Sequence, residues 1–272
     1  MHNQSLSNIA EERVKSVLIG WQIPDKRPLL KDVMSKMSNI LLSFQKPRVK
    51  AVFLNRPQRF LAKVRTSNAA DVLAYCANPG SLKGCLESGS PVVLWDSGDL
   101  KRKRRYTWRA IKIKKVWVGT DTHLTNRLVE AVLRRELFSS LSGYTSVVRE
   151  PKISGKKRID FLLTGPQGKC FIEVKSATVV QNGVAQFPDS ITPRSIEQLK
   201  ILAKKSRQGH RAVLIFVAQR GDAKAFSING FAYPEYVQAF KFAMKAGVEL
   251  FAWGFSVSPK GFGMPFSLKI LN

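Results

Sequence analysis

The sequence predicts a mixed α+β protein in which a small β-barrel of the OB kind precedes an α/β domain. Short strand-like segments separated by turn residues occupy residues 47–118, whereas helical and strand-like segments alternate over residues 119–272. The first pattern is typical of a small barrel, and the second of a sheet covered by helices. Residues 1–46 show helical periodicity instead. We therefore expect a helical extension (1–46), the barrel (47–118) and the α/β domain (119–272).

The extension is interpreted as two helices. Ser7 is placed to cap the first, Pro24 and Pro28 interrupt the pattern, and a second helix is expected from Leu29 to Phe44. Apolar side chains of the second helix recur at helical spacing, so they share one face that packs against the body or a partner. Acidic residues in the extension argue against an organelle-targeting peptide.

Five strands are expected in the barrel. Turn residues at Asn78–Ser81, Ser88–Ser90 and Ser97–Asp99 punctuate the apolar segments. The expected strands are Val49–Leu54, Arg59–Arg65, Asp71–Cys76, Pro91–Trp95 and Tyr106–Val118. Small barrels of this kind commonly bind single-stranded nucleic acid, which makes the barrel a candidate binding module.

A basic tract lies at the C-terminal end of the barrel. Lys101–Lys115 holds nine basic residues and no acidic one. Cationic side chains neutralise phosphates and aromatic rings stack on bases, so this mixture favours nucleic-acid binding. The alternative is an edge strand protected by lysines beside a flexible basic loop, but the tract is longer than such protection requires. The candidate nucleic-acid-binding residues are Lys101, Arg102, Lys103, Arg104, Arg105, Tyr106, Trp108 and Arg109.

The α/β domain is expected to run in the order helix, hairpin, helix, strand, helix and two strands. Apolar residues at helical spacing, prolines at helix starts and glycines after helix ends set the limits. Ala212–Ala218 is apolar throughout, as is typical of a strand buried on both faces. The other expected elements are Leu124–Leu141 (helix), Arg158–Ser176 (hairpin), Pro193–Gly209 (helix), a helix from Pro234, and strands Val248–Val257 and Phe266–Leu271.

The hairpin carries the most distinctive set of charged side chains. Asp160 opens its first strand, and Glu173 and Lys175 lie on its second. Side chains two residues apart point to the same face of a strand, so Glu173 and Lys175 share a face. If the strands pair in register, Asp160 lies opposite Glu173. Two carboxylates and one ammonium group then meet at one end of the sheet.

Such a trio suits metal-assisted hydrolysis of a phosphodiester. The carboxylates of Asp160 and Glu173 are suitable ligands for Mg²⁺ or Mn²⁺, and Lys175 can orient the attacking water or offset charge in the transition state. The alternative is an exposed strand end whose carboxylates form ordinary surface ion pairs. The spacing of the three residues resembles the core motif of PD-(D/E)XK nucleases, so the α/β domain is expected to be nuclease-like.

The composition indicates a polyanionic partner. Lys and Arg number 45 against 19 acidic residues, which gives a formal charge of +26. Such an excess opposes compaction through self-repulsion, so we expect it to serve a polyanion. Nucleic acid is the first candidate and an anionic membrane surface the second, while a general bias toward lysine is the alternative without a partner.

Cysteines and apolar segments limit other classes of function. Cys76, Cys85 and Cys170 form no C-x-x-C pair and are accompanied by only three histidines, so no structural zinc site is expected. No apolar run is long enough to span a bilayer, and no signal-peptide pattern is present. We therefore expect a cytoplasmic protein without a membrane partner.

Seven short motifs in a fixed order resemble the sugar fermentation stimulation protein family (SfsA), from about residue 49 to the C-terminus. They are Arg59–Val64, Asn78–Cys85, Asn126–Leu128, Leu141–Tyr144, Arg158–Phe161, Glu173–Ser176 and Phe187–Asp189. The resemblance implies an OB-like domain followed by a PD-(D/E)XK-like domain. It also implies a DNA-binding protein linked by name to the regulation of sugar catabolism, especially that of maltose.

Residue roles also follow from the resemblance. Asp160 and Glu173 carry over as metal ligands and Lys175 as the catalytic lysine. Glu150 occupies a position where such folds often supply another carboxylate. Asp189 belongs to the family's Phe-Pro-Asp motif, for which a loop-capping role is equally compatible.

The sequence departs from the family pattern at two places. Tyr75–Gly80 lacks the histidine and threonine of the family motif, which puts any function of that barrel loop in doubt. After Pro193, Glu197 and Gln198 replace a basic pair, which is expected to weaken phosphate binding.

Two functions of different classes are compatible with these residues. The first is a metal-dependent nuclease acting on DNA. The second is a non-catalytic DNA-binding regulator of sugar (maltose) catabolism, in which the nuclease-like domain is only a scaffold. RNA binding or association with the ribosome is a third alternative, with DNA favoured over RNA. The oligomeric state is left open.

Overall fold

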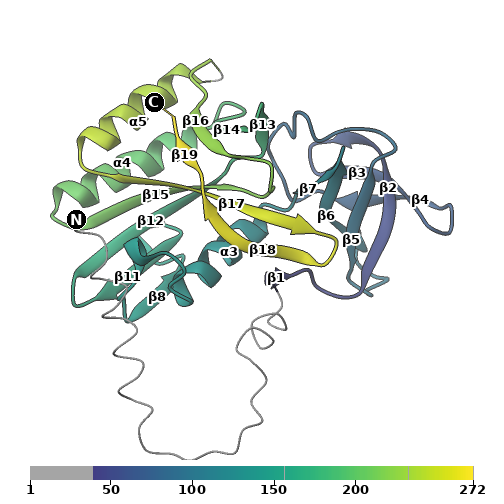
Figure 1. Ribbon diagram of the computed structural model, residues 1–272, viewed down its shortest axis with the longest axis horizontal. Helices are drawn as coiled ribbons and strands as arrows, with labels where there is room; N and C mark the ends of the chain where they lie inside the picture. Colours follow the sequence, from purple (N-terminus) through teal and green to yellow (C-terminus); the bar gives the residue numbers. More distant parts are fainter. Residues whose placement is uncertain (1–38, 156, 232, 272) are drawn as a thin grey trace, which may run out of the picture. The chain divides into compact units, whose positions relative to one another are not determined.

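The computed structural model describes residues 39–155, 157–231 and 233–271, which belong to one compact unit (Figure 1). This part of the chain begins with a short strand, continues into a β-barrel and ends in an α/β domain. Most of the predicted helical extension, including its first helix, lies outside the described residues.

Five strands close into a barrel and a sixth extends it. In sheet order they are β4 (Asp71–Tyr75), β3 (Leu61–Thr66), β2 (Arg48–Gln58), β5 (Pro91–Asp96), β6 (Tyr106–Ile113) and β7 (Val116–Gly119). A parallel pairing of Tyr75 with Thr107 joins β4 to β6 and closes the ring. The predicted OB-like barrel is confirmed. The single strand predicted over Tyr106–Val118 is divided into β6 and β7 at Lys114, which has a φ of 52°.

The barrel interior is filled by side chains rather than left open for a ligand. Phe53 and Trp108 stack with their ring centroids 5.2 Å apart, and neither is accessible to solvent beyond 1%. Aliphatic side chains of the barrel strands surround them, among them Ala62, Val64, Leu94 and Ile111. Burying each large apolar side chain stabilises the fold by about 1.5–3 kcal/mol, so this cluster holds the barrel together.

A seven-stranded mixed sheet is the centre of the α/β domain. Its order is β1 (Ile40–Ser43), β18 (Gly261–Ser267), β17 (Glu249–Ser258), β15 (Arg211–Ala218), β12 (Gly168–Ser176), β11 (Phe161–Gly165) and β8 (Ser146–Arg149). The central strands β12, β15 and β17 are parallel, and the outer pairings are antiparallel. The prediction that residues 212–218 form a buried central strand is confirmed, because every residue of β15 except Arg211 is buried.

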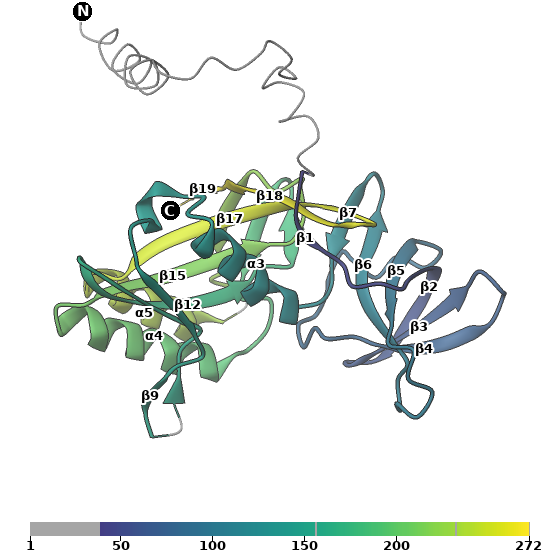
Figure 2. The same ribbon diagram turned by 90° about the horizontal axis from the view of Figure 1, so that it is seen from below.

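Helices cover both faces of this sheet (Figure 2). On one face α3 (His123–Arg134) packs Leu128 and Val132 among inward side chains such as Ile172. On the other face α4 (Pro193–Arg207) and α5 (Pro234–Lys245) pack around Phe216. The helix predicted over Leu124–Leu141 is shorter than expected. It ends at Arg134, since Glu136 has a left-handed φ of 49°, and a 3₁₀ turn, η1 (Ser139–Leu141), follows.

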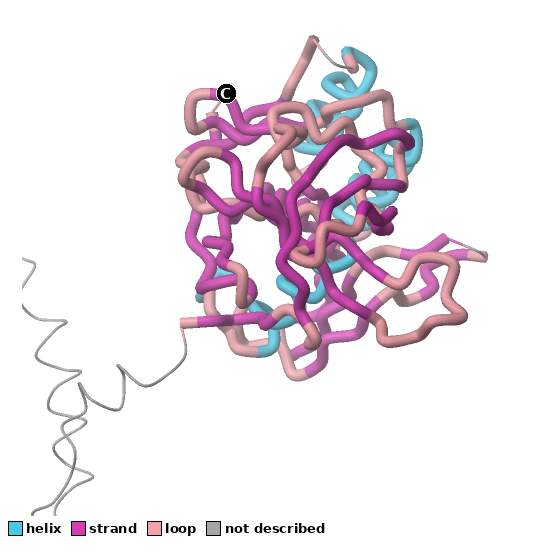
Figure 3. The backbone as a smooth tube through the Cα atoms, turned by 90° about the vertical axis from the view of Figure 1, so that its right-hand side faces the viewer, coloured by secondary structure: helices cyan, strands magenta, loops and turns pink. Residues whose placement is uncertain are grey.

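Several short strands were not expected from the sequence. A four-stranded sheet contains β13 (Val179–Gln181), β14 (Val184–Phe187), β16 (Ala225–Ile228) and β19 (Lys269–Ile270), and a hairpin contains β9 (Lys152–Ser154) and β10 (Lys157–Arg158). The strand predicted over Phe266–Leu271 is therefore divided between β18 and β19. Figure 3 shows how strand, rather than helix, dominates the described chain.

The prediction of a helix over Leu29–Phe44 is wrong for its described part. Ile40–Ser43 forms β1, which pairs with β18 at the edge of the main sheet. Leu41 and Phe44 are buried in the same core as α3, and the Phe44 ring packs edge-on against Phe262 at 5.2 Å. The end of the predicted 1–46 extension thus belongs to the α/β domain.

The barrel is joined to the α/β domain by buried polar contacts. Arg109 of β6 forms an ion pair with Asp121, just before α3, and both side chains are almost inaccessible to solvent. Gly119 donates its backbone N–H to the carbonyl of Gln219 at 2.8 Å, and the Gln219 amide donates to the Thr125 hydroxyl at 2.7 Å. A larger residue at Gly119 would force its neighbours to shift, because a Cβ would lie 2.9 Å from the Gln219 Cβ and from a ring carbon of Phe262.

Two further expectations concern the cysteines and membrane spans. Cys76, Cys85 and Cys170 are all buried free thiols. Within the described residues, no helix combines the length and the apolar character needed to cross a bilayer.

Candidate active site

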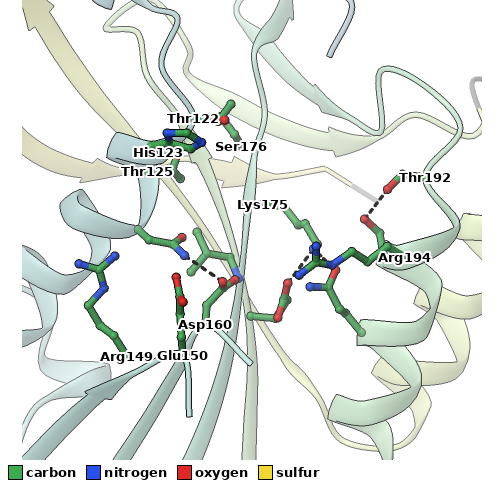
Figure 4. A pocket seen from close by; sticks show the side chains of 15 residues that line it. Thr122, His123, Thr125, Arg149, Glu150, Asp160, Lys175, Ser176, Thr192 and Arg194 are labelled. Carbon is green, nitrogen blue, oxygen red and sulfur yellow. Dashed lines mark hydrogen bonds and ion pairs between the residues drawn. The ribbon is translucent and has the colours of Figure 1, made fainter. Parts of the chain in front are cut away.

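A polar pocket of about 510 Å³ lies where β11 and β12 meet the start of α3 and the start of α4 (Figure 4). Its lining includes all three residues of the predicted trio, Asp160, Glu173 and Lys175. In Figure 4, Lys175 and Arg194 lie on the side of α4. The structure therefore gathers the predicted trio in one cavity.

Asp160 is held in place by neighbouring groups. It directly precedes β11, whose Phe161 pairs with Ile172, so Asp160 lies beside Glu173 as the register requires. The Asn126 amide of α3 donates to Asp160 Oδ1 at 2.8 Å, and the backbone N–H of Val174 donates to Oδ2 at 2.7 Å. Each carboxylate oxygen keeps a second lone pair for another partner. The two hydrogen bonds thus orient the carboxylate of Asp160, and its remaining lone pairs can still accept a further hydrogen bond or bind a cation.

Glu173 is the most buried acidic group of the pocket. Its side chain is 2% exposed, and Oε1 accepts a hydrogen bond from Lys175 Nζ at 2.7 Å. The other oxygen, Oε2, is buried and has no hydrogen-bond partner among the described residues. Burial raises the pKa of Glu173 to about 7; Lys175 acts against the shift and Asp160 adds to it.

The ammonium group of Lys175 is fixed from two sides. Besides Glu173, it donates to the side-chain oxygen of Gln198 on α4. Only 12% of the lysine side chain is exposed. Gln198, which stands where the family pattern has a basic residue, thus accepts a hydrogen bond that a cation could not accept. Glu197 does not face the pocket, since it forms exposed ion pairs with lysines.

The predicted third carboxylate, Glu150, is less buried than the other two. Glu150 lines the same pocket but is exposed, and its backbone N–H donates to the carbonyl of Asp160 at 2.9 Å. Among the described residues, no three or more His, Cys, Asp or Glu side chains are grouped as metal ligands. Glu150 therefore shares the cavity with Asp160 and Glu173, and its role as a metal ligand stays a prediction.

Sequence reasoning missed the residues that complete the pocket. Asn126 orients Asp160, and the guanidinium groups of Arg149 and Arg194 add positive charge to the lining. Arg149 precedes Glu150 at the end of β8 and also contacts Glu130 at 3.1 Å. Asn126 lies within a recognised family motif, but only the packing of α3 against β12 shows that its side chain reaches Asp160.

The basic tract is exposed only in part. Lys101, Arg102 and Lys103 are exposed on the loop between β5 and β6, where Arg102 lies 5.4 Å from the ring centroid of Trp95. Arg105 is held by two hydrogen bonds to Asp96, at 2.7 and 2.6 Å. Arg104 and Tyr106 are half-buried. The loop residues are thus the part of the predicted surface that a polyanion can reach directly.

The prediction is wrong for Trp108 and Arg109. Trp108 is completely buried in the barrel, where its indole N–H donates to the carbonyl of Ala110 at 3.1 Å, so it presents no face to a base. Arg109 is 6% exposed, and its guanidinium group forms an ion pair with Asp121 and donates a hydrogen bond to the side-chain oxygen of Gln45. Both side chains serve the fold, because β6 is buried on both of its faces.

Comparison with known proteins gives one consistent result. Residues 54–120 match the family model of the SfsA N-terminal OB domain, and residues 123–261 match that of the sugar fermentation stimulation protein RE domain. Sugar fermentation stimulation protein homologues from Geobacter sulfurreducens and Synechococcus sp. (strain JA-2-3B'a(2-13)) are 38% and 39% identical to the chain. These alignments cover 83% and 80% of this chain, and 97% and 91% of the relatives.

A solved structure agrees with these relatives. The structure of Pyrococcus furiosus SfsA in complex with Ca²⁺ superposes with a TM-score of 0.77 and 26% sequence identity. The match covers 86% of this chain and 99% of that one. Since both family models are matched in chain order and the relatives are covered almost from end to end, this chain belongs to the sugar fermentation stimulation protein family.

Proposed function

We propose that this protein is a divalent-metal-dependent nuclease of the PD-(D/E)XK type that hydrolyses phosphodiester bonds in DNA. The observation that carries the proposal is the buried, unpaired Oε2 of Glu173 next to Asp160 and Lys175, in a pocket that arginines also line. A buried acceptor without a partner costs about 1–3 kcal/mol. A ligand that binds Oε2, such as a cation, would remove this cost.

The donor set fits a hard divalent cation. Asp160 and Glu173 supply carboxylate oxygens, and Mg²⁺, Mn²⁺ and Ca²⁺ all prefer oxygen ligands. That the Pyrococcus furiosus relative was solved in complex with Ca²⁺ supports a divalent cation here. Mg²⁺ or Mn²⁺ is the cation proposed for catalysis. When bound, it would polarise a phosphate oxygen and lower the pKa of a water molecule.

Other residues of the chain would orient Asp160, position the attacking water and bind phosphates. Asn126 and the Val174 N–H keep Asp160 oriented toward the site. Lys175, held by Glu173 and Gln198, presents an ammonium group that orients the attacking water and stabilises charge on the phosphate in the transition state. Arg149 and Arg194 supply further positive charge for phosphates of the strand.

The test is a cleavage assay on single- and double-stranded DNA with Mg²⁺ or Mn²⁺. Asp160→Asn and Glu173→Gln are expected to reduce the rate by about 100-fold or more, since each removes a proposed ligand of the cation that activates the water. Glu197→Gln is the matched control, because Glu197 is exposed on α4 outside the pocket. Cleavage that survives both EDTA and Asp160→Asn would contradict the proposal.

A second candidate is a non-catalytic DNA-binding protein that regulates sugar (maltose) catabolism. It is favoured by the exposed Lys101–Lys103 loop and by the absence of a third grouped carboxylate among the described residues. This function predicts salt-dependent DNA binding that persists in Glu173→Gln, with no cleavage by any metal. Titration with RNA in the same assay separates a DNA-binding protein from an RNA-binding one.

A further inference from the structure

A second pocket, of about 470 Å³, adjoins the candidate active site. Lys175, Ser176, Thr122, Thr192 and Ser195 line both cavities, so a ligand can extend from one into the other without leaving the protein surface. Its remaining walls come from Arg59 at the turn between β2 and β3, from the barrel loop after β4, from Thr178, and from the end of β14 with the loop that leads to α4. Apart from the shared Lys175, no residue of this second pocket has a role in the proposed hydrolysis.

The two loops are fastened to each other, which makes the pocket a built feature. Asp189 Oδ2 accepts hydrogen bonds from the Ser81 backbone N–H at 3.0 Å and from the Ser81 hydroxyl at 3.1 Å. Asn78 donates to the Thr178 hydroxyl at 3.4 Å. Gly80 allows the close approach, because a Cβ at this position would lie 2.7 Å from Asp189 Oδ2. The barrel loop that departs from the family pattern therefore forms one wall of the second pocket.

The two pockets offer different chemistry. The first contains two carboxylates, a lysine and two arginines, which suits a phosphate and its cation. The second is lined by the apolar side chains of Pro79, Phe187 and Ile191, together with hydroxyl groups, the Asp189 carboxylate, the Arg59 side chain and the shared Lys175. Ile191 is 71% exposed although it is large and apolar. A carboxylate repels a phosphate but accepts hydrogen bonds from the edge of a base.

We propose that the second pocket receives an unpaired nucleobase of the strand whose phosphate occupies the first pocket. The inference rests on the proposed nuclease function and adds the substrate class: single-stranded or locally opened nucleic acid. A base stacked within a duplex cannot enter a side pocket without leaving its partner. Apolar walls accept the base faces, while Asp189 and the neighbouring hydroxyl groups accept or donate hydrogen bonds at its edge.

The experiment measures binding rather than cleavage. Fluorescence anisotropy is recorded with the full chain in EDTA, using a labelled single-stranded 12-mer and a set of copies with one abasic position each. We expect abasic substitution at one position, or at two adjacent ones, to weaken binding by about tenfold, and substitution elsewhere to have little effect. A matched duplex is expected to bind more weakly than the single strand. A flat abasic profile, or a duplex that binds as tightly as the single strand, overturns the proposal.

A pocket-filling variant tests the location. Ser190 is an exposed residue of the second pocket, so Ser190→Trp fills the cavity without disturbing a core. The variant is expected to bind the intact strand about tenfold more weakly and to lose the dependence on the abasic position. Ser67→Trp, at an exposed turn between β3 and β4, is the matched control. If Ser190→Trp keeps the wild-type profile, the base lies elsewhere. Because no step requires cleavage, a protein that binds in this way without cutting DNA refutes the nuclease proposal alone.

Discussion

Glu173 is a carboxylate in surroundings that disfavour its charge. Burial removes water from the group, the neighbouring Asp160 repels the charged form, and Lys175 only partly offsets both effects. The pKa of Glu173 consequently rises from the ordinary value of 4.5 to about 7. The divalent cation proposed above would therefore compete with a proton for the same buried oxygens near neutral pH. The raised pKa of Glu173 leads to two predictions.

The first concerns stability in the absence of metal. Because the folded-state pKa of Glu173 is raised, folded protein binds a proton that unfolded protein has already lost between pH 4.5 and about 7. The contribution to the free energy of unfolding is fully present below pH 4.5 and is lost as pH rises through about 7, by about 3 kcal/mol.

Urea denaturation in EDTA at several pH values measures this loss. Glu173→Gln cannot titrate, so its free energy of unfolding is expected to fall less than that of the wild type over the same interval. Glu197→Gln, which changes an exposed carboxylate, is expected to follow the wild-type curve. A constant difference between wild type and Glu173→Gln across the interval would mean that the pKa is not raised.

The second concerns metal binding. A cation must displace the proton of Glu173, so its affinity is expected to rise with pH until about pH 7 and then level off. Calorimetric titration with Ca²⁺ at pH 5.5 and 7.5 tests this, with roughly a tenfold gain expected for each pH unit below 7. Asp160→Asn is expected to remove the heat of binding. An affinity that does not depend on pH would exclude Glu173 as a ligand.

At the scale of single elements, the predicted basic tract consists of two parts with different roles. The loop between β5 and β6 is exposed and is proposed to bind DNA, whereas the residues of β6 stabilise the barrel. Trp108 and Arg109 are fixed in β6, whereas Lys101, Arg102 and Lys103 are exposed. The triple substitution of Lys101, Arg102 and Lys103 by alanine is expected to weaken DNA binding and leave the melting temperature unchanged. The slope of log K against log salt should become shallower by up to about 2.7, which corresponds to three phosphate contacts.

Trp108→Ala provides the contrast for that experiment. Deleting a buried aromatic ring typically costs 3–5 kcal/mol, so this variant is expected to lose barrel stability. Trp108→Phe should recover part of it while leaving DNA binding per folded molecule unchanged. If the triple loop variant binds DNA with wild-type affinity and salt slope, the loop is not the contact surface.

The strand β1 is a second element whose structure differs from the prediction. Its apolar residues fit a helix or a strand equally well, since short apolar runs do not distinguish the two. Ile40–Ser43 becomes a strand because the edge of β18 supplies backbone hydrogen-bond partners for it. Phe44→Ala is expected to destabilise the fold by about 3–5 kcal/mol, whereas Ser43→Ala, at an exposed position, should change it little. Thermal or urea denaturation measures both.

At the scale of the whole molecule, the ion pair of Arg109 and Asp121 joins the barrel to α3. Both side chains are buried, so removal of one partner leaves an uncompensated charge. Asp121→Ala is expected to destabilise the protein by about 3–5 kcal/mol. The double variant Arg109→Met with Asp121→Ala should cost less than Asp121→Ala alone, because no buried charge remains unpaired. Additive costs, measured by urea denaturation, would contradict this account.

Much of the architecture could be predicted because it depends on residues that are close together in the sequence. The turn residues separate the barrel strands, the apolar run of β15 reports burial on both faces, and the hairpin register places Asp160 beside Glu173. What could not be predicted depends on contacts between distant segments. The reach of Asn126 to Asp160, the hydrogen bond of Gln198 to Lys175 and the burial of Trp108 are set by packing across the molecule, which periodicity does not encode.

The pairing of β1 with β18 also affects how the protein is made. During synthesis Ile40–Ser43 leaves the ribosome before its partners at residues 261–263, which emerge only after the barrel and most of the α/β domain have been made. The barrel, whose strands end at Gly119, can close long before that, since domains tend to fold as units during synthesis. Until β18 emerges, the strand that contains Leu41 has no partner strand in the sheet. A nascent chain stalled before Gly261 would therefore carry an exposed apolar strand, the kind of segment that chaperones bind.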